Sequence, residues 1–428
     1  MNNNNIVTTK NTSLAFVCIA IILVAVNMRS PIVLVGSIAP VIEQALGISQ
    51  LEIGWLGAIP MLSFAFGALV SAKFSKWFGI HNLLPVMILL LALGMVLRVF
   101  AIGWWWFFAG TAILSLAIGF LNTITMPAIK QLAPKNIPLV TGLYSLAMTI
   151  MAGLVAGIVL PMSDLLGWRL ATGVWAVLSV FAFVFWWQLR PNLVLDYQQQ
   201  QHSNRTLSDG NSPQVVIQKR QQMPNSKHNK SMWQTPLAWW LAIFLGLQSL
   251  MYYLVASFLP SIWASKGLSL IQAGQLAMLF QLMAPIAILL LTWVMSRKDH
   301  ARTMAMLASI LIAMGAAGMA FGRFDVNPLF WASVWTICAG FGASLVFTLT
   351  LMLINLRTYD TVQASELSSM SQAVGYTIAM AGPLGAGWLH EVSGDWHLPL
   401  TVLTILMLIN IGFAWAISGR VMIDGKPF

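Results

Sequence analysis

The chain alternates between long apolar runs and short polar connections. An apolar helix of about 20 residues is long enough to cross the hydrocarbon core of a bilayer. Twelve such runs occur, at 14–40, 51–73, 82–102, 104–129, 139–162, 168–189, 236–263, 270–296, 303–322, 328–354, 365–389 and 398–419. The pattern predicts an all-α polytopic membrane protein with twelve transmembrane helices.

One stretch interrupts this pattern. Residues 190–235 are rich in Gln, Asn, Ser and Lys and show almost no apolar periodicity, which is typical of a hydrophilic linker. This segment divides the chain into an N-terminal six-helix bundle, 1–189, and a C-terminal six-helix bundle, 236–428. We expect the linker between the bundles to be mobile.

The two halves carry an internal repeat. SIAPVIEQALGISQLEIG (37–54) aligns without gaps with SFLPSIWASKGLSLIQAG (257–274), and six positions are identical, with Pro and Gly at equal spacing. Parallel repeats of this kind are typical of transporters built from two pseudo-symmetric halves, whose substrate site lies at the repeat interface near the bilayer midplane.

Composition agrees with this class, because 58% of the residues are hydrophobic and only 8% are charged, against roughly 25% charged residues in soluble domains. The net charge of +10 does not call for a nucleic-acid partner. With the N-terminus inside, seventeen basic residues fall in inner loops and tails, and three fall in outer loops: Arg169, Lys266 and Arg323. This bias predicts that both termini and the linker are cytoplasmic.

Arg29 lies near the centre of the first predicted span, in AVNMRSPIVL (25–34). An arginine at the bilayer centre costs about 2.5–3.5 kcal/mol on insertion scales and is expected to face a cavity or a partner. The twelve Asp and Glu residues all fall toward the ends of the predicted spans or outside them. Two interpretations stay open. In the first, the hydrogen-bond donors of Arg29 are satisfied by backbone carbonyls, amides and water. In the second, Arg29 is the fixed cation of a site for a carboxylate or another small oxyanion.

The repeat places further polar groups at the same depth. Its offset of 220 residues relates Arg29 to Ser249, so Gln248, Ser249, Tyr252 and Tyr253 lie at that level of the seventh helix. Gln248 and Tyr252 are four residues apart and therefore share a helix face. These groups either line a substrate site or form hydrogen bonds between packed helices.

Other polar residues lie within the apolar spans, and together they suggest a polar cavity whose fixed charge is positive. They are Asn122, Tyr144, Ser145, Gln281, Gln372 and Tyr376. Arg98, near the outer end of the third span, either snorkels to the outer interface or forms part of an outer gate or an anion funnel.

Several functional classes lack their sequence signatures. No phosphate-binding loop that ends in Lys-Ser/Thr occurs, which argues against ATP as the driving force. No HExxH motif or cluster of His and Cys occurs, which argues against a metal enzyme. Cys18 and Cys338 lie in apolar runs and are expected to be free thiols. We expect no catalytic residues, no cofactor and no metal, and hence not an enzyme.

Six stretches resemble the major facilitator superfamily and, within it, the cyanate and 2-nitroimidazole transporter family. They are NMRSPI (27–32), LRVF (97–100), AIGFLNTITMPAIKQLAP (117–134), TGLYSLAM (141–148), GWRLA (167–171) and GLQSLMYYLVASFLPSI (246–262). The resemblance covers nearly the whole chain and implies alternating access by rocking of two halves in a bacterial inner membrane. Two details depart from the family. The family pattern is similar to a Gly-Asn pair before a Leu-Pro-Ala-Ile-Lys run, whereas here Asn122 is displaced from Gly119. The stretch 67–81, between the second and third helices, lacks the Asp of the superfamily's cytoplasmic signature.

The sequence therefore predicts a secondary transporter of a small anion, cyanate-like or a small organic acid. Its partners are a small-molecule substrate and the lipid bilayer. One alternative is an exporter of neutral nitroaromatic or amphipathic toxic compounds, and another is a membrane enzyme or receptor. Direction, coupling ion and oligomeric state stay open, with a monomer as the simplest case.

Overall fold

A computed structural model describes residues 14–133, 136–209, 232–295, 297, 300–322, 326–358, 361–417 and 419. The described residues form helices and no strand. The first half comprises α1 (Leu14–Ser37), α2 (Ala39–Leu46), α3 (Gln50–Phe78), α4 (Ile80–Val99), α5 (Trp104–Leu132), α6 (Ile137–Leu166) and α7 (Trp168–Asp209). The second comprises η1 (Met232–Gln234), α9 (Pro236–Ser265), α10 (Leu270–Met295), α11 (Ala301–Phe321), α12 (Pro328–Leu356), α13 (Thr361–Ser393) and α14 (His397–Ile417).

The twelve predicted spans correspond to the twelve long helices of the described residues. Ten of these are long and apolar enough to cross a membrane on their own. The other two, α3 and α13, pack against each other at the boundary between the halves. There a helix faces protein on one side, so it can carry polar residues such as those in SSMSQ (368–372) of α13.

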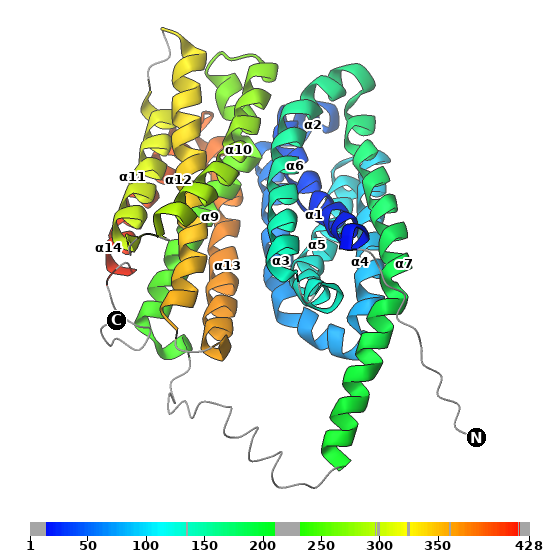
Figure 1. Cartoon of the computed structure of the whole chain (residues 1–428). Coiled ribbons are helices and arrows are strands. Elements are labelled where there is room, and N and C mark those ends of the chain that lie inside the picture. Colours follow the sequence, from blue (N-terminus) through cyan, green and yellow to red (C-terminus); the bar gives the residue numbers. More distant parts are fainter. Residues whose placement is uncertain are drawn as a thin grey trace, which may run out of the picture.

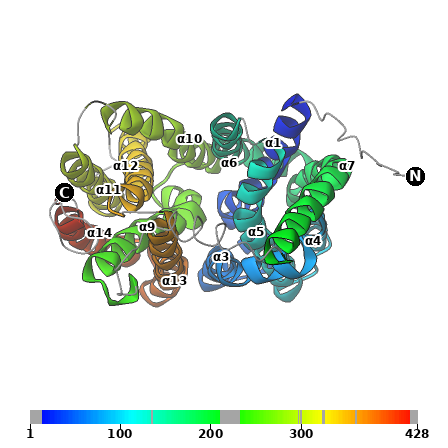
Figure 2. The same cartoon turned by 60° about the horizontal axis from the view of Figure 1, so that its bottom comes forward.

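The helices form two bundles that stand side by side (Figure 1). Helices α1 to α7 make one bundle and α9 to α14 the other, and two helix pairs join them: α3 packs on α13, and α6 packs on α10. Figure 2 shows these two pairs on either side of α1 and α9, which also contact each other. The central helices α1 and α9 therefore lie where the halves meet.

The beginning of the predicted linker is helical. Helix α7 continues without a break to Asp209, past the end of its predicted span at 189. This extension contains a run of Gln residues, which favour helices although they give no apolar pattern. Residues 210–231 lie outside the described residues, as do 1–13 and Arg323. We call the end of the molecule where α7 leaves the bundle the linker end, and the opposite end the far end.

The internal repeat has a structural basis in two matching turns at the far end. Gly47 and Gly267 both adopt a left-handed backbone, with φ of 62° and 89°, which favours glycine. Two residues later, Ser49 accepts a hydrogen bond from the backbone N–H of Glu52 at 3.3 Å. Ser269 accepts the equivalent bond from Gln272, also at 3.3 Å. Each serine therefore caps the helix that follows it, α3 or α10.

The last identical pair of the repeat lies at the contact between the halves. Gly54 of α3 packs directly against the backbone carbonyl of Pro383 on α13. Gly274 of α10 packs against the side chain of Leu160 on α6. The repeat thus makes the two joining helix pairs equivalent, since each uses a glycine one turn inside the capped helix.

The far end is further closed by a hydrogen bond between the halves. The backbone N–H of Leu51, in the first turn of α3, donates to Glu391 Oε1 at the end of α13, at 3.1 Å. A carboxylate at a helix N-terminus also interacts favourably with the helix dipole. Together with the Gly54 contact, this bond holds α3 against α13 at the far end.

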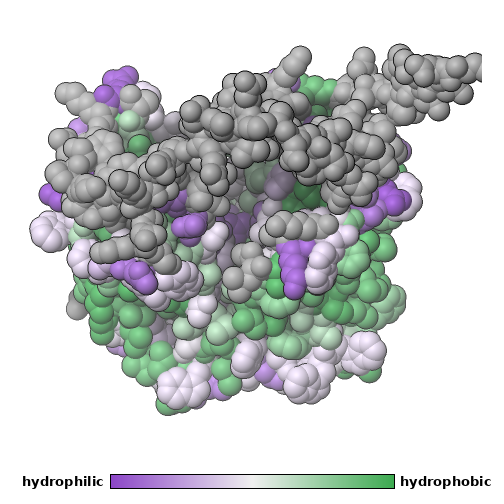
Figure 3. All heavy atoms as spheres, turned by 90° about the horizontal axis from the view of Figure 1, so that it is seen from below, coloured by the Kyte–Doolittle hydropathy of each residue, from purple (hydrophilic) through white to green (hydrophobic). Residues whose placement is uncertain are grey.

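The outer surface of the bundles is apolar. Large hydrophobic side chains such as Leu62, Leu89, Val180, Leu289 and Leu408 are more than half exposed on the long helices. Seen from the linker end, the flank that is free of grey atoms is dominated by apolar residues (Figure 3). An apolar flank of this kind faces lipid in a membrane protein.

Candidate functional site

Arg29 lies on α1 between the two halves. Its guanidinium carbon is 5.3 Å from the centre of the Tyr252 ring on α9, within the range of a cation–π interaction. The side chain of the neighbouring Tyr253 also lies beside the guanidinium. Arg29 belongs to the N-terminal half and both tyrosines to the C-terminal half. The charge at the centre of the first span is therefore held by the opposite bundle.

Two further phenols lie near the same guanidinium. They are Tyr144 of α6 and Tyr376 of α13. The chain contains six tyrosines, and four of them thus gather around this one cation. We call Tyr144, Tyr252, Tyr253 and Tyr376 the tyrosine cluster. It draws on helices from both halves.

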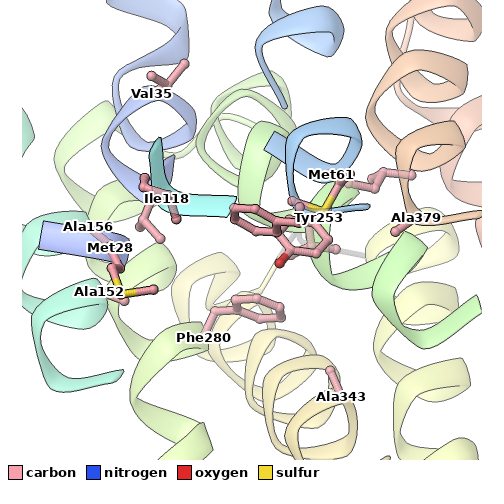
Figure 4. Packing of buried hydrophobic residues seen from close by; sticks show 14 of the residues in the cluster. Met28, Val35, Met61, Ile118, Ala152, Ala156, Tyr253, Phe280, Ala343 and Ala379 are labelled. Atoms are coloured by element: carbon pink, nitrogen blue, oxygen red, sulfur yellow. The ribbon is translucent and has the colours of Figure 1, made fainter. Parts of the chain in front are cut away.

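Aromatic rings pack the cluster into place. Tyr252 and Tyr253 meet edge to face, with ring centres 5.0 Å apart. Tyr252 also packs on Phe280 of α10 at 5.5 Å, and Tyr376 meets Phe64 of α3 edge-on at 5.7 Å. Figure 4 shows Tyr253 and Phe280 among buried residues from both halves, with Met28 of α1 nearby. Arg29 is therefore surrounded by rings that are themselves fixed by packing.

Two hydroxyl groups of the cluster have partners other than Arg29. The Tyr252 hydroxyl donates to Gln281 Oε1 on α10 at 2.8 Å. The Tyr144 hydroxyl lies 3.3 Å from the sulfur of Met28. Met28 precedes Arg29, so this contact joins α6 to α1 next to the arginine. The cluster offers hydroxyl groups and ring faces, all of them neutral.

Among the described residues, no carboxylate contacts Arg29; the groups that act on it are the phenols. Arg29 nevertheless keeps part of its surface exposed. A half-buried arginine without an acid, in the middle of a membrane helix, has donors that a ligand can take up.

Gln248 and Ser249 are not brought to Arg29. The side-chain amide of Gln248 donates to the carbonyl oxygen of Ala343 on α12 at 3.0 Å, and Ser249 donates to Gln248 Oε1 at 3.1 Å. Both side chains are buried and tie α9 to α12 within one half. These contacts agree with the second interpretation from the sequence, hydrogen bonding between packed helices. Tyr252, one turn further along α9, instead contacts α10 and Arg29.

Two other predicted residues have no described contact with the cluster. Gln372 donates to Ser368 of its own helix at 2.9 Å. Asn122 is half-buried on α5, and none of its described contacts reaches Arg29. Ser145, next to Tyr144, is exposed on α6. Of the further polar residues named from the sequence, Gln281 joins the site through Tyr252, and Tyr376 through Arg29.

Arg98 is buried inside the N-terminal half, with an exposed fraction of only 2%. This buried position differs from a side chain that snorkels to the outer interface and from one that lines an outer funnel, the alternatives considered from the sequence. Its guanidinium donates to the Pro31 carbonyl oxygen at 2.7 Å and to Thr111 Oγ1 at 3.0 Å, and it lies over the Phe107 ring. Arg98 therefore joins α4 to α1 and α5.

Sequence reasoning placed Tyr253 at the right depth but did not make it a site residue, and it did not identify the rings of Phe64 and Phe280. One signal was available. Tyrosine is rare in this chain, with 6 residues against 22 phenylalanines, so a hydroxyl group inside an apolar span marks a position where a phenylalanine would not serve.

No group of three or more His, Cys, Asp or Glu able to hold a metal ion occurs in the described part of the chain. Cys18 and Cys338 are free thiols, which confirms the prediction made from their positions.

Residues 15–380 match the Major Facilitator Superfamily. The chain is 30% identical over 390 residues to a 2-nitroimidazole transporter of Escherichia coli (strain K12), covering 91% of this chain and 92% of that one. It is 26% identical over 403 residues to the cyanate transport protein CynX of the same organism, covering 92% and 96%.

A solved structure shows the same fold. The crystal structure of the nucleoside transporter NupG superimposes with a TM-score of 0.71 at 13% identity, covering 95% of this chain and 99% of that one. At this identity the likeness concerns the fold alone. The sequence relatives are transporters, so the protein is a multi-pass membrane transporter and not an enzyme.

Proposed function

Because the chain belongs to the Major Facilitator Superfamily, we propose that it is a secondary transporter that moves a small anion by alternating access. Arg29 would bind the charge of the anion. One observation carries this proposal: a half-buried arginine lies between the two halves, next to four neutral phenols and contacted by no described carboxylate.

Electrostatics explains why an anion suits this site. A guanidinium group removed from water needs acceptors, and a phenol supplies only a weak one. A carboxylate or similar oxyanion takes two parallel hydrogen bonds from the planar fork of an arginine. Binding an anion therefore completes the coordination of Arg29 and neutralises its charge at the midplane.

The arrangement of the halves supports alternating access. The named contacts of α3 with α13 lie toward the far end and at the level of the tyrosine cluster. A rocking motion that separates Gly54 from Pro383 would open the site to that end. With the cytoplasmic linker that the basic residues predict, the far end is the outside, and the two bundles 1–189 and 236–428 are the rocking bodies. The bacterial inner membrane is the proposed location.

A second candidate function has its own support. The 30% identical relative carries the name of a nitroimidazole transporter, and the rings around Arg29 would also accommodate a neutral nitroaromatic compound. In that case export of a toxic compound would be the role, and Arg29 would be structural.

Flux measurements separate the two functions. Purified protein is reconstituted into vesicles, and uptake of radiolabelled cyanate, benzoate and nitrobenzene is compared for wild type, Arg29→Gln and Arg302→Gln. Arg302 lies over the Trp415 ring of α14 and has no described contact with the tyrosine cluster, so it carries the same substitution as a control.

Anion transport through Arg29 predicts that Arg29→Gln abolishes uptake of the anions while Arg302→Gln retains it. Normal anion uptake by Arg29→Gln would overturn the proposal. Nitrobenzene flux above that of protein-free vesicles, equal for all three proteins and without anion uptake, would support transport of neutral compounds instead.

A further inference from the structure

The surroundings of Arg29 point to a particular class of anion. Resting on the function proposed above, we infer that the substrate is an aryl carboxylate: its carboxylate group binds Arg29, and its aromatic ring stacks on the face of Tyr252. Tyr252 is then the residue that determines specificity for a ring.

The first argument is the amount of aromatic surface at the site. Charge alone would be satisfied by an arginine with water and backbone carbonyls, as in a site for an inorganic anion. Here four tyrosines and two phenylalanines lie around or next to the guanidinium. Rings placed this way attract any apolar group by burial, and they add a stacking contribution for a ligand that itself has a conjugated plane.

The second argument is the position of Arg29 over the ring of Tyr252. In the structure the guanidinium carbon lies 5.3 Å from the ring centre, so the cation occupies a ring face. When the guanidinium turns to a carboxylate, it gives up that face. An aryl ring attached to the carboxylate takes the vacated place, whereas an aliphatic chain or an inorganic ion leaves it without an equivalent partner.

The third argument is that Tyr252 is held rigidly. Its hydroxyl donates to Gln281 at 2.8 Å, Phe280 packs against it at 5.5 Å, and Tyr253 meets it at an interplanar angle of 87°. A ring fixed from three directions presents its remaining face in one orientation. Binding then requires little ordering of the protein, which favours selectivity for a planar ligand.

The test compares two acids of equal charge and similar size, benzoate and cyclohexanecarboxylate, which differ in whether the ring is planar and conjugated. Affinities are measured by isothermal titration calorimetry on the full-length protein in detergent. The variants are Tyr252→Phe, which keeps the ring and loses the bond to Gln281, Tyr252→Leu, which loses the ring, and Arg29→Gln.

Stacking on one ring predicts that wild type binds benzoate roughly 2- to 10-fold more tightly than cyclohexanecarboxylate. Tyr252→Phe should keep this ratio. Tyr252→Leu should bring the ratio of the two affinities close to one. Continued binding of cyclohexanecarboxylate by this variant would show that its site is folded. If Tyr252 had a purely structural role, Tyr252→Leu would weaken the binding of both acids equally and leave the ratio of their affinities unchanged.

The inference fails if wild type binds both acids equally, or if Tyr252→Leu keeps the preference for benzoate. In either case, if Arg29→Gln no longer binds either acid, the proposed anion transporter is retained and only the substrate class is different. Binding of both acids by Arg29→Gln as tightly as by wild type would instead overturn the proposed function and this inference with it.

Discussion

The contact between Gly54 and Pro383 leads to a sharp prediction about the closed far end. In Gly54→Ala, the new methyl carbon would lie 2.6 Å from the carbonyl oxygen of Pro383, whereas an ordinary contact begins at 3.4 Å. The obstacle is backbone, so no side chain can turn away. Helices α3 and α13 must therefore move apart by about 0.8 Å, the difference between these two distances.

Overpacking of this kind costs typically about 1–3 kcal/mol. The cost applies only to the state in which α3 and α13 touch, since rocking apart removes the clash. The ratio of far-end-closed to far-end-open protein should therefore fall by roughly 5- to 150-fold. Alanine also favours a helix over glycine by about 1 kcal/mol, so overall melting temperature is the wrong measurement and a distance is the right one.

Double electron–electron resonance measures that distance. Spin labels are attached to cysteines placed at Leu165 of α6 and Val392 of α13, both highly exposed at the far end, with Cys18 and Cys338 replaced by serine. Gly54→Ala should add a longer-distance population. Gly385→Ala is the matched control, because it lies on α13 with no atom within 4 Å of its added Cβ. Identical distance distributions for both variants would refute this account of the closed end.

Three further predictions concern stability. Arg98→Gln should lower the free energy of unfolding by about 1–3 kcal/mol, because it leaves the buried Pro31 carbonyl and Thr111 without their donor; unchanged benzoate affinity in the folded fraction, measured by calorimetry, would distinguish it from Arg29→Gln. Ser49→Ala and Ser269→Ala should each cost about 0.5–2 kcal/mol in thermal unfolding, and the double variant should show the sum, because the two caps lie on different helices in different halves. Burial raises the pKa of the Glu43 carboxyl above its usual range, although a hydrogen bond from Gln50 opposes this shift. A raised pKa favours the folded state while the group is protonated, and this benefit is lost as pH rises through the folded pKa. Glu43→Gln should therefore raise the melting temperature at neutral pH and leave it unchanged below about pH 4; an equal effect at both pH values would contradict the assignment.

The architecture followed closely from local signals in the sequence. Gly47 and Gly267 mark turns because glycine favours a left-handed backbone, and Ser49 and Ser269 mark helix starts because they cap the backbone. Such signals depend on only a few neighbouring residues. The extension of α7 to Asp209 was missed because a polar helix that leaves the bundle has no apolar face to reveal it.

The site could be predicted only in part. Arg29 stands out because a charge inside an apolar span is costly wherever the neighbouring helices lie. Which neighbours a polar residue meets is a matter of packing. Gln248 and Tyr252 share a face by spacing, yet one reaches Ala343 of α12 and the other Gln281 of α10, because α9 contacts several helices along that face. The gathering of Tyr144 and Tyr376 around Arg29 joins distant parts of the chain, and spacing cannot indicate it.

The central claim is that Arg29 binds the charge of an anion. Thermal stabilisation of the detergent-purified protein tests it most directly, because a ligand stabilises the folded state that binds it, by about 2.7 kcal/mol at a concentration of 100 times its Kd. Benzoate, acetate and cyanate are compared with nitrobenzene, for wild type beside Arg29→Gln. The account predicts that at least one anion raises the melting temperature of wild type and has no effect on Arg29→Gln. Stabilisation by nitrobenzene alone, equal in both proteins, would contradict it.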